Sequence, residues 1–187
     1  MNTTFDALIK QAYAKPAVRA HLVHSGMMSL YCDFSGTERH IHGVACAIVF
    51  NRTVRVQAAR LEHPYSLGSD YGELQAIRFS LELLASELAE ERPNQAAPRS
   101  AAVFTDCRNA SRLLAERDFA ASADAASFSD DSRYDDACQA IRAQLEQLKL
   151  DHPRMSFSIN YLHRGKEGNA LHRMAHNAAR ACTDPQG

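Results

Sequence analysis

The chain has no tryptophan, no apolar run of membrane-spanning length and almost no net charge. Its 187 residues carry 21 lysines and arginines against 22 aspartates and glutamates, a formal net charge of −1. A membrane helix needs about 20 consecutive apolar residues, so we expect no membrane partner. The charge balance also argues against a protein that holds nucleic acid by bulk charge alone.

Cysteine pairs with zinc-site spacing are missing as well. The five cysteines are odd in number and scattered, which favours reduced thiols. Cys32 and Cys46 fall in apolar strands and are expected in the core. Charged residues interrupt the apolar ones in residues 1–15, which is not the pattern of a signal peptide. We therefore expect a cytoplasmic protein, and nothing in the pattern sets an oligomeric state.

Apolar periodicity predicts one α/β domain over residues 27–182, after a helical extension over 1–26 and before a tail over 183–187. A low-complexity Ala/Ser/Asp stretch over 118–133 is expected to be a solvated loop. The first three strands should form an antiparallel meander, and a later strand–helix–strand crossover should add parallel strands. The expected strands are 27–34, 43–50, 53–61, 101–106 and 155–162, and the expected helices are 71–90, 107–116, 134–149 and 168–182.

Three carboxylates stand at the ends of predicted elements. Asp33 and Asp106 each end an apolar strand, and Glu73 opens the most periodic helix. Taken singly, each has an ordinary explanation, as a turn aspartate or as a charge near a helix N-terminus. Ligand groups in open α/β sheets gather at strand tips, and hard oxygen ligands suit Mg²⁺ and Mn²⁺. Together the three predict a site for two divalent cations.

The element order and four short motifs resemble ribonuclease H type 1 and its superfamily. The motifs are residues 31–36, 73–77, 104–107 and 163–169. The resemblance implies a ribonuclease H-like three-layer α/β/α fold, with a five-stranded mixed sheet whose first three strands are antiparallel. It also implies an endonuclease that cuts the RNA strand of RNA/DNA hybrids with two Mg²⁺ or Mn²⁺ ions and leaves 5′-phosphate ends. Asp33, Glu73 and Asp106 would bind the ions, and His163 would assist catalysis.

The chain departs from the family pattern where the fourth carboxylate belongs. That position falls on Arg173, with His172 one residue earlier. Both lie within one turn of Asn169, so His172 as a metal ligand and Arg173 as a phosphate contact remain alternatives. His176, one turn further, is expected to be solvated. The resemblance implies a substrate contact at Ser35, Ser69, Asp70, Arg108, Asn169 and Arg173.

Two other functions fit the same sequence. The family's pair of asparagines is replaced by Ser69 and Asp70, and its tryptophan-rich basic handle is missing. These losses favour a non-catalytic nucleic-acid-binding or scaffold module with the same fold. A related nuclease acting on single-stranded RNA or on ends is a third possibility. The retained carboxylates argue against a scaffold, because clustered carboxylates repel one another without cations.

Overall fold

The computed structural model describes residues 26–36, 41–61, 68–90, 97–110, 114, 132–163 and 169–183. The expected helix in the N-terminal extension and nearly all of the acidic stretch 118–133 lie outside these residues. In the part of the chain that is described, no helix is both long enough and apolar enough to cross a membrane.

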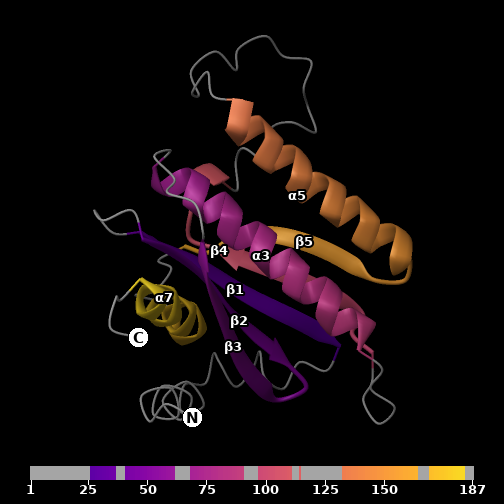
Figure 1. Cartoon of the computed structure of the whole chain (residues 1–187). Helices are drawn as coiled ribbons and strands as arrows, with labels where there is room; N and C mark the ends of the chain where they lie inside the picture. Colours follow the sequence, from indigo (N-terminus) through magenta and orange to yellow (C-terminus); the bar gives the residue numbers. More distant parts are fainter. Residues whose placement is uncertain are drawn as a thin grey trace.

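The centre of the molecule is a five-stranded sheet with the order β3-β2-β1-β4-β5 (Figure 1). The strands β1, β2 and β3 pair antiparallel, whereas β4 pairs parallel with both β1 and β5. The predicted mixed sheet, with its first three strands antiparallel, is therefore confirmed. The strands are β1 (Met27–Gly36), β2 (His42–Phe50), β3 (Thr53–Leu61), β4 (Ser100–Thr105) and β5 (Ser156–Tyr161).

A two-residue turn joins β2 to β3. Asn51 and Arg52 both have left-handed backbone conformations, with φ of 47° and 62°. Two successive left-handed residues match the right-handed twist of a hairpin. The Thr53 hydroxyl donates a 2.6 Å hydrogen bond to the Phe50 carbonyl at the same turn. The turn fixes the register of the hairpin as far as His42 opposite Leu61.

Helices cover both faces of the sheet, which confirms the three-layer arrangement (Figure 1). Helices α3 (Ser69–Ala89) and α5 (Ser132–Asp151) lie on one face, and α7 (Ala170–Cys182) lies on the other. The expected helix 71–90 begins two residues earlier than predicted, directly after Gly68, whose φ is 85°. Glu73 consequently lies in the second turn of α3 rather than at its start.

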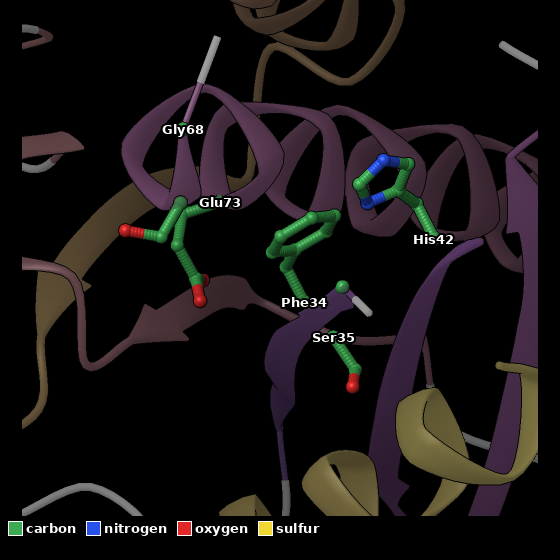
Figure 2. Close-up of a pocket in the computed structure, with 7 residues that line it drawn as sticks. Phe34, Ser35, His42, Gly68 and Glu73 are labelled. Carbon is green, nitrogen blue, oxygen red and sulfur yellow. The ribbon is translucent and has the colours of Figure 1, made fainter. Parts of the chain in front are cut away.

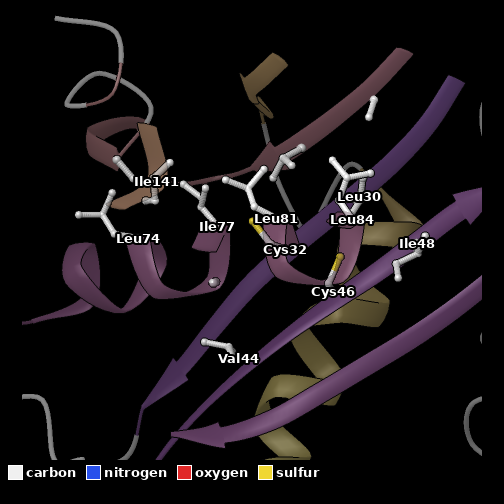
Figure 3. Close-up of a cluster of buried hydrophobic side chains, with 14 of the residues drawn as sticks. Leu30, Cys32, Val44, Cys46, Ile48, Leu74, Ile77, Leu81, Leu84 and Ile141 are labelled. Atoms are coloured by element: carbon white, nitrogen blue, oxygen red, sulfur yellow. The ribbon is translucent and has the colours of Figure 1, made fainter. Parts of the chain in front are cut away.

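The central strand β1 sends alternate side chains to the two faces, as a strand must. Met28, Leu30 and Cys32 join the core under α3 and α5, whereas Tyr31 packs under α7. Figure 3 shows Cys32 and Cys46 among leucine and isoleucine side chains, and both are 0% exposed, so their predicted core position is confirmed. The same alternation puts Asp33 on the face that α7 covers.

Candidate metal centre

Two of the predicted carboxylates lie near the end of β4. Asp106 directly follows that strand, whereas Asp33 does not end its own strand as expected but lies inside β1, three residues before Gly36. Strands β1 and β4 pair parallel, and Tyr31 is the register partner of Phe104. Asp33 and Asp106 each follow two residues later, so parallel pairing brings both to the same edge. Asp33 is buried at 3% exposure, and the Asp106 side chain is 30% exposed. One carboxylate is thus enclosed, and the other faces solvent in part.

Helix α7 adds an imidazole to this pair. His172 Nε2 lies 3.5 Å from Asp33 Oδ1 and 3.6 Å from Asp106 Oδ1, and its side chain is fully buried. The three candidate ligand atoms lie within 4.8 Å of one another. Two ligand atoms that are each about 2.1 Å from one cation lie roughly 3.0–3.6 Å apart. The spacing and the donor set therefore fit a divalent cation.

Asn169 determines where α7 begins and hence where His172 lies. Its Oδ1 accepts hydrogen bonds from the backbone N–H groups of Leu171 and His172, at 2.9 and 3.2 Å. This is the capping role for which asparagine is preferred. The Asn169 side chain also hydrogen-bonds Tyr31, whose pKa burial raises to about 12 against the lowering effect of that bond. These contacts are internal, and the predicted substrate contact of Asn169 stays a prediction.

His176 also belongs to this site. Its Nδ1 lies 2.9 Å from Asp33 Oδ2, and its side chain is 20% exposed. The expectation that it is a solvated side chain is therefore wrong. The signal was present in the sequence, because residues four apart lie on one helix face and His176 is four residues after His172.

Glu73 approaches the site from the other face of the sheet. Its carboxyl accepts a hydrogen bond from the backbone N–H of Phe34. Burial raises its pKa well above the usual 4.5, and the negative charges of Asp33 and Asp106 raise it further. The buried Oε2 atom has no hydrogen-bond partner within the described ranges. A bound cation would offset the negative charge of this buried carboxylate. Glu73 is nevertheless not one of the three residues whose ligand atoms lie within 4.8 Å of one another.

A cavity of about 400 Å³ adjoins Glu73 where β1 ends and α3 begins. Figure 2 shows the Phe34 ring between Glu73 and His42, and the Phe34 and His42 rings stack with centroids 5.5 Å apart. Both serines predicted to contact substrate face this space. The cavity is lined by Phe34, Ser35, Gly36, His42, Gly68, Ser69 and Glu73.

The remaining predicted substrate residues have different surroundings. Asp70 accepts hydrogen bonds from Asn109 Nδ2 at 2.9 Å and from Cys107 Sγ at 3.5 Å, so it ties α3 to the segment that follows β4. Arg108 is exposed on that same segment. Arg173 is half-buried, and its Nε is enclosed without a hydrogen-bond partner among the residues that are described. Their substrate contacts stay predictions.

His163, predicted to assist catalysis, is exposed just after β5. Its ring meets Tyr161 edge-on, with centroids 6.4 Å apart. The structure therefore brings together Asp33, Asp106 and His172, and places Glu73 close enough to be affected by both aspartates. The role of His163 in proton transfer or product departure remains a prediction.

Comparison with known proteins gives distant structural similarities. No protein-family model and no curated protein matches the chain. Among solved structures it is similar to the foamy viral protease-reverse transcriptase in complex with dsDNA. The identity is 12% and the TM-score 0.44, over 86% of this chain and 97% of that one. It is also similar to the native prototype foamy virus protease-reverse transcriptase, at 12% identity and a TM-score of 0.45, over 85% of this chain and 21% of that one.

Proposed function

We propose that the protein is a metal-dependent nuclease of the ribonuclease H type 1 kind. It would cut the RNA strand of RNA/DNA hybrids endonucleolytically, with Mg²⁺ or Mn²⁺, in the cytoplasm. One observation carries the proposal, namely that Asp33, Asp106 and His172 converge just past the end of the parallel pairing of β1 with β4. Ligand and catalytic groups in α/β sheets occur at the carboxyl ends of strands.

The residues present divide the work of such a reaction. Asp33 and Asp106 supply negative charge for the cations, Glu73 adds a carboxylate from α3, and His172 adds a nitrogen ligand. When bound, divalent cations lower the pKa of an attacking water and stabilise the leaving oxygen. The low exposure of Asp33 and His172 keeps bulk water from competing for these ligands.

Substrate would be held by groups around this centre. Arg173 follows His172 directly in α7, and a guanidinium suits a phosphate oxygen. Ser35 and Ser69 line the cavity beside Glu73. Hydroxyl groups can pair with the 2′-hydroxyls that distinguish RNA from DNA in the wide minor groove. These contacts would select the strand that is cut.

Cleavage of a labelled RNA/DNA hybrid, alongside RNA/RNA and single-stranded RNA, tests the proposal in Mg²⁺ and in Mn²⁺. We expect cutting of the hybrid's RNA strand by the wild type and by Asp136→Asn, a control at an exposed carboxylate of α5. Asp106→Asn should lower the rate by at least about 100-fold, since a bound cation contributes several kcal/mol. Tight binding without cutting would favour the scaffold alternative, and preference for free ends would favour the third function.

A further inference from the structure

We propose that His176 is a positioning residue that orients Asp33 for the cation. Its Nδ1–H donates to Asp33 Oδ2 and leaves Oδ1 directed at His172 and Asp106. The inference rests on the proposed function, because it gives His176 a part in the same metal site. Neither the sequence pattern nor the ribonuclease H resemblance assigns a role to this residue.

The distances separate the two oxygens of Asp33. Oδ2 lies 2.9 Å from His176 Nδ1, which is hydrogen-bond length, whereas Oδ1 lies 3.5 Å from His172 Nε2. An ionised carboxylate accepts only, so with Asp33 ionised, as a cation ligand is, the proton of this bond belongs to His176 Nδ1. One oxygen of Asp33 is therefore engaged in a directed bond, and the other faces the cluster of candidate ligand atoms.

An aspartate needs such a restraint. The torsion that rotates its carboxylate is broad and roughly two-fold, so the side chain does not fix its own oxygens. Asp33 is 3% exposed, which leaves little room for water to fix it instead. Hydrogen bonds from outside the ligand set typically change metal affinity by about 10- to 100-fold. The bond from His176 is suited to that effect.

Helix α7 keeps both histidines in place together. They lie one turn apart, so the helix presents them on one face. A Cβ at Gly43 of β2 would lie only 2.5 Å from the Ala179 carbonyl, so α7 runs very close to the sheet. This close approach lets the short imidazole of His176 reach the Asp33 carboxylate.

Mn²⁺ affinity, measured by electron paramagnetic resonance of the free ion, tests the inference without any assay of activity. His176→Leu removes the donor, and we expect it to weaken Mn²⁺ binding about tenfold or more. His176→Asn keeps an amide N–H near the Nδ1 position and should stay within about threefold of wild type. Asn177→Ala, at the exposed neighbouring residue, should bind as wild type does.

The outcomes distinguish this inference from the proposed function. If Asp106→Asn abolishes Mn²⁺ binding and His176→Leu does not change it, the metal site stands and the positioning role is wrong. Equal losses in His176→Leu and His176→Asn would indicate packing instead of the hydrogen bond. If Asp106→Asn leaves Mn²⁺ binding unchanged, the metal site and the inference fall together. Nitrogen-15 spectra of the metal-free protein should show a protonated Nδ1 at His176, and an unprotonated Nδ1 would overturn the bond itself.

Discussion

The two faces of the sheet are built from different side chains. Under α3 and α5, the core contains large aliphatic residues such as Leu30, Ile77 and Leu81. Under α7, alanines of β2 and α7 replace many of them, and Gly43 leaves no room for a Cβ. Small residues let a helix approach a sheet closely. Helix α7 therefore lies close to the sheet, and its histidines reach the strands. We call this side of the sheet the thin face.

This difference separates stability from chemistry. The face under α3 and α5, here called the thick face, holds the largest cluster of buried apolar side chains, so we expect it to supply most of the hydrophobic stabilisation. The thin face carries Asp33 and His172, which are buried, and His176, whose side chain is 20% exposed. Polar groups in such places cost free energy unless they are paired, so their presence favours a functional reason. Glu73 reaches this site from the thick face.

The largest expected effect is on the thick face, where Ile77→Ala should lower the free energy of unfolding by about 2–5 kcal/mol. Ile77 is fully buried and packs between α3 and the sheet. Denaturant titration gives the change, and Ser86→Ala, on the exposed side of the same helix, should stay within about 0.5 kcal/mol.

The Mn²⁺ affinity of the folded Ile77→Ala protein tests whether the two faces of the sheet act independently. It should match wild type at a temperature where both proteins are folded, because Ile77 belongs to the core on the opposite face from α7. A weaker affinity in this variant would show that the two faces are coupled, and that stability and metal binding are not assigned to separate faces.

The order and type of the described elements were predictable because apolar residues mark them. Apolar segments predicted β1 and β2, and apolar residues at helical spacing predicted α3, each to within about two residues. The ends of the predicted strands pointed to Asp33 and Asp106, and parallel pairing brings the two close together, although β1 continues three residues beyond Asp33. The rotation of α7 was not predictable, because neighbours such as His172 and Arg173 differ by about 100° around a helix. Packing of Ala175, Ala178 and Ala179 against the sheet fixes that rotation and turns His172 inward.

A smaller expected effect, on the choice between Mg²⁺ and Mn²⁺, tests the rotation of α7. With a nitrogen ligand in place of the fourth carboxylate, the site should favour Mn²⁺ over Mg²⁺. His172→Asp should raise the ratio of Mg²⁺- to Mn²⁺-supported cleavage about tenfold, a difference of about 1.4 kcal/mol. Arg173→Asp is the matched control and should leave the ratio unchanged. A response to Arg173→Asp instead would mean that α7 is rotated from the position described, and no response to either would mean that α7 supplies no ligand.

The smallest expected effect is on the pH dependence of the melting temperature and comes from Glu73, which reaches the metal site from the thick face. Its pKa is raised by burial and by the charges of Asp33 and Asp106, so the folded protein binds this proton more tightly than the unfolded chain does. Without metal, the stability that Glu73 contributes is complete below its unfolded pKa, near 4.5, and is lost as the pH rises towards the raised folded value.

Glu73→Gln should remove that loss, because a glutamine stays neutral. In EDTA, the melting temperature of the variant minus that of wild type should grow by a few degrees between pH 5 and pH 8, since about 1 kcal/mol shifts a domain of this size by roughly 2–4 °C. Glu146→Gln, at an exposed site on α5, gives the background change. Saturating Mn²⁺ should make this melting-temperature difference negative. A cation that binds only the folded state stabilises wild type, with its intact carboxylate, more than the variant. A difference that stays constant with pH would mean that Glu73 is solvated in the metal-free protein, and the thick face would then contribute no charge to the site.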